Sequence, residues 1–322
     1  MNQFTIVDNQ EILPLINLSQ MSTIRDILRY SISLFNQSNI YFGHGYENAT
    51  QEAWALILAS LNISSYDLSE DILLNSKITD TEKNIIQNNL IQRIVERKPL
   101  SYITKKTAFA GLEFYVDERV IIPRSPINEV LKSKIRPLLK KEPQNILDLC
   151  TGSGCIAICA AYEFEEAYID AIDISVDAIN ISEINIYNHQ LENRVFPILS
   201  DLFESIKDIK YDLIISNPPY VDRNDIEDMP TEYSYEPMLA LEAGENGLEI
   251  AYKILQESLN HLNEDGILIC EVGNSMIALQ KEFPELDFKF FDLENGGDGV
   301  FYLTQKELQN KKDYINSIIN IL

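Results

Sequence analysis

The sequence has few of the features that mark secreted, metal-binding or membrane proteins. It contains only four cysteines and no CxxC spacing, so we expect no metal site and no disulfide framework, but buried thiols in a reducing compartment. No apolar run approaches the roughly eighteen residues of a membrane-spanning helix, so we expect no membrane partner. No lysine or arginine precedes Arg25, which argues against a secretory signal peptide and for a cytoplasmic protein.

Positive charge is also scarce. The 322 residues include 26 lysines and arginines against 50 aspartates and glutamates, which gives a net charge of −24. Such a chain repels a nucleic-acid backbone unless a local basic patch reverses the field, so we expect no DNA partner and favour a basic protein. One stretch, residues 119–141, has seven basic residues and one acid. It is interpreted mainly as a solvated helix face, and an accessory RNA contact stays open.

Glycine is nearly absent from the first third of the chain, where only two glycines precede Gly111. Apolar residues recur there at helical spacing in residues 24–35, 54–61 and 85–95. Thr79 and Glu82 form a capping box before the third of these segments, and Pro99 is expected to end its helix. Residues 1–105 are therefore predicted to form a small helical domain.

Residues 106–126 are predicted to be a β-hairpin that links this domain to the rest of the chain. Two β-rich runs flank the acidic pair Asp117–Glu118, which we expect to form the turn. The runs cover residues 109–116 and 119–122. Pro123 and Pro126 then end the second strand, because proline removes a donor from the ladder.

Short apolar segments and helical segments alternate from Asn145 onward, within a third predicted domain of residues 127–322. The predicted strands cover residues 146–149, 167–172, 195–199, 213–215, 267–272, 288–292 and 300–304. The predicted helices cover residues 155–162, 176–187 and 248–262. This alternation indicates right-handed βαβ units, and so an α/β fold with a mostly parallel sheet and helices on both faces. We expect two strands to close the chain.

The segment from Asp148 to Gly154 follows a predicted strand and opens a helix. Gly152 and Gly154 let the backbone turn sharply beside a ligand, and the helix N-terminus behind them presents N–H groups to it. The segment has no GKS or GKT of a phosphate loop, and the third glycine of the dinucleotide fingerprint would fall at Ala157. It therefore predicts a nucleotide-like ligand of another kind.

Two aspartates follow the next two predicted strands. Asp173 lies 25 residues after Asp148, at a strand tip where a carboxylate can bind both ribose hydroxyls, although an acid beside a helix start is the simpler alternative. Asp201 stands between Ser200 and Leu202, where a polar tip and apolar residues can clamp a purine ring. Together with the glycine loop, these residues predict a nucleoside site.

The sequence Asn217-Pro218-Pro219-Tyr220, the reaction loop, follows the predicted strand 213–215. Open α/β sheets bind ligands at the carboxyl ends of their strands. An amide or aromatic amine nitrogen is a poor nucleophile because its lone pair is delocalised, and two acceptors aimed at its N–H groups would draw the lone pair toward the attacked carbon. The Asn217 side-chain oxygen and the Pro218 carbonyl can be these acceptors, stiffened by the prolines, while Tyr220 packs on a planar substrate group. A purely structural Pro-Pro turn is the alternative.

On these residues the chain resembles the class I S-adenosylmethionine-dependent methyltransferases that carry an NPPY loop, and among them the protein-glutamine N5-methyltransferases. The likeness covers nearly the whole chain, including its ending from Glu294 to Phe301. The release-factor branch typically has Pro-Arg-Pro-Asp-Thr at residues 123–127 and glycine at position 150. Four features instead resemble the branch that methylates the third protein of the large ribosomal subunit. They are Cys150, Arg124-Ser125-Pro126, Tyr235-Glu236-Pro237 and Glu271-Val272-Gly273-Asn274-Ser275.

The resemblance implies a Rossmann-like, seven-stranded sheet with an antiparallel final hairpin, and a helical domain that recognises substrate. It implies S-adenosyl-L-methionine as cofactor, S-adenosyl-L-homocysteine as product, and a glutamine N5 of a basic large-subunit ribosomal protein as acceptor, free or within a pre-ribosome, in aid of ribosome assembly. The implied catalytic residues are Asn217, Pro218, Pro219 and Tyr220, and the implied substrate-binding residues are these four with Pro123 and Arg124. The implied cofactor-binding residues are Asp148, Cys150, Thr151, Gly152, Ser153, Gly154, Asp173, Ile174, Asp201, Leu202 and Asn217.

Three other functions compete with this one. A release-factor methyltransferase shares the fold and the chemistry. A DNA adenine N6-methyltransferase uses a related loop, but base flipping requires a cationic groove, and residues 222–249 hold nine acids against one base, Arg223. A protein that only binds the cofactor has no use for the aimed acceptors of the reaction loop.

Overall fold

The computed structural model describes residues 4–6, 12–14, 16–64, 67–294 and 296–321, so Asn295 of the family-like ending lies outside the described residues. The chain divides into two compact units. The first comprises residues 1–106 together with Pro230–Tyr235, and the second comprises residues 107–229 and 236–322. A short segment that follows the reaction loop in the sequence therefore belongs to the first unit, which the sequence did not predict.

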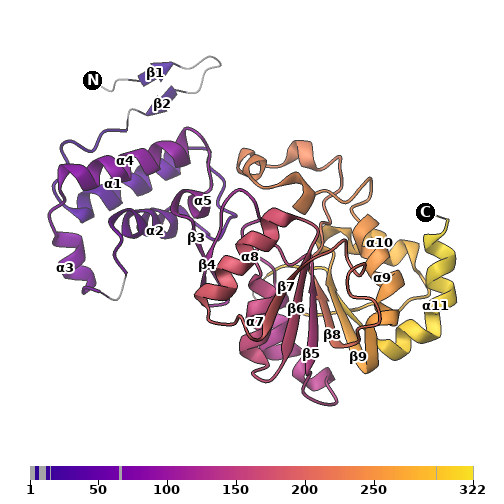
Figure 1. The fold of residues 1–322 in the computed structure, drawn as a ribbon. Coiled ribbons are helices and arrows are strands. Elements are labelled where there is room, and N and C mark those ends of the chain that lie inside the picture. Colours follow the sequence, from indigo (N-terminus) through magenta and orange to yellow (C-terminus); the bar gives the residue numbers. More distant parts are fainter. Residues whose placement is uncertain (1–3, 7–11, 15, 65–66, 295, 322) are drawn as a thin grey trace. The chain divides into compact units, whose positions relative to one another are not determined.

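Helices make up most of the first unit (Figure 1). They are α1 (Ile24–Gln37), α2 (Ala49–Leu61), α3 (Glu70–Asn75), α4 (Asp80–Ile94) and α5 (Leu100–Thr104), and β1 (Phe4–Ile6) pairs with β2 (Ile12–Pro14). Capping boxes begin α1 at Thr23 and α4 at Thr79, because each threonine and the acid three residues later satisfy each other's free backbone N–H. The prediction that Pro99 ends α4 was wrong, since α4 ends at Ile94 and Pro99 instead caps α5.

A buried ion cluster holds Pro230–Tyr235 in this unit. The Glu232 carboxylate, fully buried, accepts hydrogen bonds from Arg93 at 2.9 Å, from Arg97 at 3.0 Å and from the Tyr41 backbone N–H at 2.8 Å. Arg93 also pairs with Glu52, and both side chains are buried. Buried charges of this kind are tolerated only when they are paired and hydrogen-bonded, so the cluster fixes the segment strongly.

The predicted linker hairpin exists, but its turn is elsewhere. The strands are β3 (Lys106–Phe109) and β4 (Leu112–Tyr115), joined by Ala110 and Gly111 with φ of 56° and 85°. Two left-handed residues give the tight hairpin turn that matches strand twist. Residues 119–122 form no strand, because Asp117 makes a local turn in which its side chain accepts from the Arg119 backbone N–H and pairs with the Arg119 guanidinium.

The second unit is built on a seven-stranded sheet in the order β10-β11-β9-β8-β5-β6-β7. The strands are β5 (Asn145–Leu149), β6 (Tyr168–Asp173), β7 (Val195–Leu199), β8 (Tyr211–Ser216), β9 (Leu262–Glu271), β10 (Lys289–Phe290) and β11 (Val300–Thr304). All pairings are parallel except those made by β11, which is antiparallel to β9 and to β10. The predicted seven-stranded, mostly parallel sheet with an antiparallel final hairpin is confirmed.

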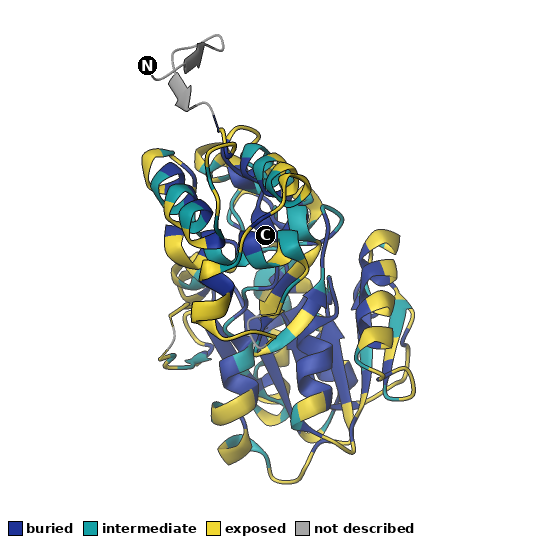
Figure 2. Ribbon diagram, turned by 90° about the vertical axis from the view of Figure 1, so that its left-hand side faces the viewer, coloured by how far each residue is buried: buried dark blue, intermediate teal, exposed yellow. Residues whose placement is uncertain are grey.

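Helices cover both faces of this sheet (Figure 2). Alternate residues of each strand point to opposite faces, so Ile146 and Leu147 enter different cores. One core contains α7 (Cys155–Glu163) and α8 (Val176–Asn188), with α6 (Ile127–Glu129) and the π-helical turn Val130–Lys134. The other contains α9 (Glu249–His261), α10 (Met276–Glu282) and α11 (Gln305–Ile319). Cys155, Cys159 and Cys270 are buried in these cores and Cys150 is half-buried.

The expectation that two strands close the chain was wrong, because the helix α11 follows β11. A capping box of Thr304 and Glu307 begins it. That motif was present in the sequence and would have predicted the helix. None of the helices in the described part of the chain is long and apolar enough to cross a membrane.

Candidate active site

The strand order brings the predicted site segments to one edge of the sheet. The chain runs from β5 outward to β7 and then returns to β8 on the other side of β5, so the sheet has its topological switch point beside β5. In the parallel register, Leu149 lies opposite both Ile172 and Ser216. The residues that follow these three, Cys150, Asp173 and Asn217, therefore emerge at the same edge.

Hydrogen bonds to the buried Asp148 side chain fix the glycine loop, residues 148–154, at the end of β5. The Asp148 Oδ2 atom accepts hydrogen bonds from the Thr151 hydroxyl at 2.5 Å and from the Ala157 backbone N–H at 3.1 Å. Burial raises the pKa of Asp148 to about 7, against these two hydrogen bonds. Gly154 has φ of +79°, and a Cβ there would lie 3.1 Å from Ser182 Cβ on α8, so glycine permits both the turn and the close packing.

Asp173 joins the glycine loop to the start of α8. Its Oδ2 accepts from the Gly152 N–H and its Oδ1 from the Ser175 N–H, both at 2.9 Å. Burial raises the pKa of Asp173, and these backbone N–H groups oppose the rise. Each carboxylate oxygen has a second lone pair, so the side chain retains acceptor capacity.

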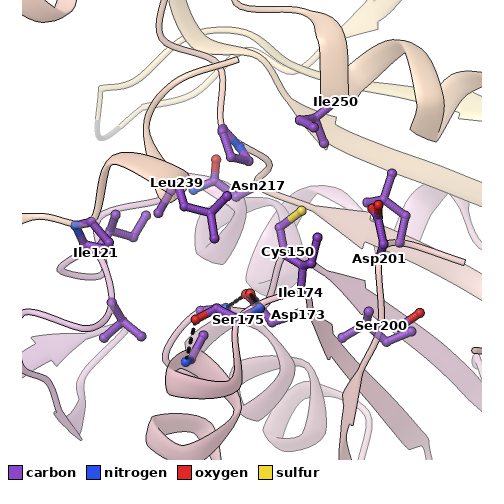
Figure 3. A pocket seen from close by; sticks show the side chains of 18 of the residues that line it. Ile121, Cys150, Asp173, Ile174, Ser175, Ser200, Asp201, Asn217, Leu239 and Ile250 are labelled. Carbon is purple, nitrogen blue, oxygen red and sulfur yellow. Dashed lines mark hydrogen bonds between the residues drawn. The ribbon is translucent and has the colours of Figure 1, made fainter. Parts of the chain in front are cut away.

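A pocket opens above these strand ends (Figure 3). The predicted cofactor-binding residues that line it are Cys150, Gly152, Asp173, Ile174, Asp201, Leu202 and Asn217, joined by Pro219 of the reaction loop and by Ser200. In Figure 3, Asn217 and Cys150 lie between Ile121 and Leu239 on one side and Asp201 on the other. The pocket thus combines carboxylates, an amide and a largely apolar wall.

Several predicted residues are absent from the pocket lining given by the described part of the chain. They are Asp148, Thr151, Ser153, Gly154, Pro218, Tyr220, Pro123 and Arg124. The lining also contains residues that the sequence analysis missed. Among them are Arg119, Ile121, Leu239, Ile250 and Lys253. No motif marks these residues, because only the tertiary fold brings the segment after the hairpin, the loop before α9 and α9 itself to this edge.

Asn217 lines the pocket and, like Asp148 at the start of the glycine loop, has a side-chain acceptor that no described residue satisfies. The Asn217 Oδ1 atom is buried and accepts no hydrogen bond from the described residues. Its neighbour Ser216 is fixed, since the Ser216 hydroxyl donates to the Leu149 carbonyl at 2.9 Å. A buried acceptor without a donor costs free energy, so an N–H donor that reaches this oxygen would be stabilised by it.

Arg124 is engaged within its own unit. Its guanidinium donates to both carboxylate oxygens of Glu236, at 2.5 and 2.7 Å, and Glu236 also accepts from the Ile122 backbone N–H at 3.1 Å. Two of the branch-specific segments, Arg124-Ser125-Pro126 and Tyr235-Glu236-Pro237, are therefore in direct contact. The predicted substrate-binding role of Pro123 and Arg124 stays a prediction.

The nine acids of residues 222–249 do not form one continuous acidic surface. Glu232 and Glu236 are buried and paired with arginines, and Glu242 pairs with Arg223. Asp222 is half-buried. The exposed acids of this stretch are Asp225, Glu227, Asp228, Glu245 and Glu249. The acidic surface of this stretch is therefore carried by five of its nine acids.

The basic residues of the stretch 119–141 all have intramolecular partners. The partners are the carboxylates of Asp117, Glu236, Glu294, Glu142, Asp265 and Asp212 and, for Lys132, the carbonyl of Ala110. Although exposed ion pairs contribute little stability, nearby acids of opposite sign cancel the field that a polyanion would require. The stretch therefore offers little support for an RNA contact.

The comparisons with known proteins agree with this geometry. The family model of the methyltransferase small domain matches residues 131–232. Together with the seven-stranded sheet and the pocket at its switch point, this match defines a class I methyltransferase that uses S-adenosyl-L-methionine as its methyl donor.

Two curated relatives narrow the class. The ribosomal protein uL3 glutamine methyltransferase of Francisella tularensis is 47% identical over 298 residues, which cover 92% of this chain and 94% of that protein. The ribosomal protein uL3 glutamine methyltransferase of Neisseria meningitidis is 43% identical over 292 residues, 90% of this chain and 95% of that protein. The chain belongs to the family of ribosomal protein uL3 glutamine methyltransferases. Both names favour the ribosomal branch over the release-factor branch.

Proposed function

We propose that this protein methylates the side-chain amide nitrogen of a glutamine in ribosomal protein uL3. The observation that carries the proposal is Asn217, which lines the pocket at the end of β8 and whose Oδ1 is a buried acceptor with no donor among the described residues. A glutamine amide has two N–H donors and fits such an acceptor. The proposal includes a cytoplasmic place of action, on uL3 free or within a pre-ribosome.

The pocket residues fit the methyl donor. Asp173 is a half-buried carboxylate with spare acceptor capacity at the tip of β6, suited to ribose hydroxyls. Ile174, Leu202 and Ile250 are apolar and suit a flat purine, with Asp201 beside them as a polar partner. When bound, S-adenosyl-L-methionine supplies an electrophilic methyl group. Asp148, Thr151, Ser153 and Gly154 would contribute by shaping the glycine loop.

The reaction loop would activate the amide. Asn217 Oδ1 and the Pro218 carbonyl accept its two N–H groups, which fixes the nitrogen and draws its lone pair out of conjugation with the carbonyl. Because Pro218 and Pro219 restrict the backbone, the acceptors are arranged before substrate binds. Tyr220 is available to pack on the planar amide. The amide gives up its proton after transfer, so no strong base is required.

Substrate recognition would combine charge and the helical domain. The exposed acids Asp225, Glu227 and Asp228 follow the reaction loop in sequence, on a chain of net charge −24. Such a surface attracts a basic ribosomal protein and repels DNA. We assign substrate recognition to the helical domain of residues 1–105, with residues 106–126 as linker and residues 127–322 as the methyltransferase domain.

The test offers labelled S-adenosyl-L-methionine and three acceptors to the purified protein. The acceptors are purified uL3, a peptide-chain release factor and double-stranded DNA, with Asn217→Ala as the inactive control. We expect label in uL3, located by mass spectrometry to a glutamine side chain. Label in the release factor alone would overturn the branch assignment, and label in DNA alone would overturn the protein substrate.

A further inference from the structure

Tyr220, the last residue of the reaction loop, is fixed at three points in the second unit. Its hydroxyl donates to Glu271 Oε1 at 2.9 Å. Its carbonyl accepts from the Ser275 hydroxyl at 3.1 Å. Its ring lies against Gly273, where an added Cβ would lie 2.6 Å from Tyr220 Cε2. All three contacts come from the segment Glu271–Ser275, which the sequence analysis noted only as a mark of the branch.

Glu271 is well placed to act on the reaction loop. It is the last residue of β9, and the register pairs Cys270 of β9 with Ser216 of β8. Glu271 and Asn217 therefore emerge side by side from neighbouring strands. Glu271 Oε2 also accepts from the Ser125 hydroxyl at 2.5 Å, and Ser125 Oγ accepts from the Ile127 N–H at the start of α6.

Glu271 is buried, and in its ionised form it can only accept hydrogen bonds. The side chain is 4% exposed, and burial raises its pKa to about 7 against the hydrogen bonds from Ser125 and Tyr220 and the charge of Arg124. An ionised carboxylate lets both hydroxyls donate to it. Protonation would remove the charge and make one oxygen an O–H donor, so the hydrogen bonds from Ser125 and Tyr220 would no longer be charge-assisted.

We propose that Glu271 is a positioning residue for methyl transfer, which holds Tyr220 and thereby the reaction loop while it is itself held by Ser125. This inference rests on the proposed methylation and adds a role that no motif assigns. It makes Ser125, Glu271 and Tyr220 one unit that links the turn after the hairpin, the end of β9 and the reaction loop. Misplacing a reacting group by about 1 Å can cost a hundredfold in rate, so a single carboxylate can matter this much.

The experiment is a double-mutant cycle measured on uL3 methylation. Tyr220→Phe removes only the hydroxyl, and Glu271→Gln keeps the size of the side chain. Each is expected to lower kcat by about ten- to a hundredfold. Neither should change the cofactor Kd, because neither residue lines the pocket among the described residues. Glu271→Gln keeps one acceptor oxygen but loses the charge, so it weakens the contact that Tyr220→Phe removes. The double variant should therefore be no slower than the slower single variant.

A second tyrosine–carboxylate pair in the same sheet gives the matched control. The Tyr211 hydroxyl donates to Asp170 Oδ2 at 2.6 Å, and Tyr211 begins β8 at the end opposite to the reaction loop. Tyr211→Phe therefore removes the same kind of hydrogen bond away from the site. It should lower thermal stability without changing kcat. An equal loss of kcat in Tyr211→Phe, or independent effects of Tyr220→Phe and Glu271→Gln that multiply, would overturn the proposal.

A pH profile separates positioning from general support of the fold. The kcat of the native protein should fall as the pH drops below about 7, where Glu271 becomes protonated. Asp148 has a pKa in the same range, burial raises the pKa of the Cys270 thiol, and the Arg124 guanidinium lies near enough to Glu271 to favour its charged form. The decisive readout is the fall of kcat below about pH 7, which should be absent from the pH profile of Glu271→Gln.

Three further outcomes keep the test decisive. An unchanged profile in Glu271→Gln would overturn the role of the carboxylate. If Glu271→Gln does not fold, Tyr220→Phe and Ser125→Ala carry the cycle, since each deletes a single hydroxyl. If the native protein methylates the release factor instead of uL3, the proposed substrate fails, and the same cycle on that acceptor still decides the role of Glu271.

Discussion

Replacing Asn217 by alanine should lower kcat by roughly two to three orders of magnitude, the size expected for the loss of one preorganised polar group, with little effect on stability. In most buried positions, loss of an amide breaks hydrogen bonds of the folded state and costs about 1–3 kcal/mol. The Asn217 Oδ1 atom accepts no hydrogen bond from the described residues, so Asn217→Ala leaves no protein donor unsatisfied there. We expect the Asn217 side chain to contribute to catalysis, when a substrate amide N–H donates to its oxygen, and not to the stability of the free protein.

The magnitude follows from the role of a preorganised polar group. Removing one such group typically costs about 2.7–4 kcal/mol in the transition state, or a factor of roughly 100–1,000 in kcat. Asn217→Asp keeps an acceptor of the same size and should retain more activity than Asn217→Ala. Cofactor affinity, measured by calorimetry, should stay within about threefold of the native value, since Asn217 is one of many lining residues.

Asn185 provides the contrasting variant. Its side chain accepts from the Tyr115 N–H at 2.7 Å and donates to the carbonyls of Tyr115 and Ser153, at 3.0 and 2.8 Å. Asn185→Ala should therefore lower the free energy of unfolding by about 1–3 kcal/mol or more, because three partners lose a bond. The assay is single-turnover transfer of labelled methyl groups to uL3, with thermal unfolding of each variant. A native-like kcat in Asn217→Ala would refute the acceptor model.

Three other predictions address the cofactor, the fold and the partner. Asp173→Ala should weaken S-adenosyl-L-methionine binding by about 1.5–3 kcal/mol in calorimetry, and unchanged affinity would remove Asp173 from the site. Glu232→Ala should destabilise the helical unit by about 3–5 kcal/mol, because Arg93 and Arg97 lose a buried partner. Hydrogen exchange of the backbone amides in that unit measures this loss of stability, and substitution of the exposed Glu227 by alanine should leave the exchange unchanged. Neutralising Asp225 and Asp228 should slow association with uL3 at low salt but not with a neutral glutamine peptide; equal rates would exclude steering.

Much of the active site could be predicted from the sequence, because the patterns that mark it lie within short segments of the chain. Alternating strands and helices require only hydrophobic periodicity, and the glycine loop and the reaction loop each follow a recognisable strand. Parallel strands of one sheet place their carboxyl ends together, so Cys150, Asp173 and Asn217 could be predicted to meet before any coordinates were known. The capping boxes at Thr23 and Thr79 are equally local.

Only the tertiary structure decided which charges are free and which are internal. Glu232 and Glu236 look like members of an acidic surface in the sequence, but each is neutralised by arginines far away along the chain. The hairpin turn at Ala110 and Gly111 was missed, because this pair lacks the Asn-Gly or Asp-Gly signature of a two-residue hairpin turn. The link from Glu271 to Tyr220 joins residues 51 positions apart. Burial and pairing depend on what the fold brings near, and no local pattern encodes that.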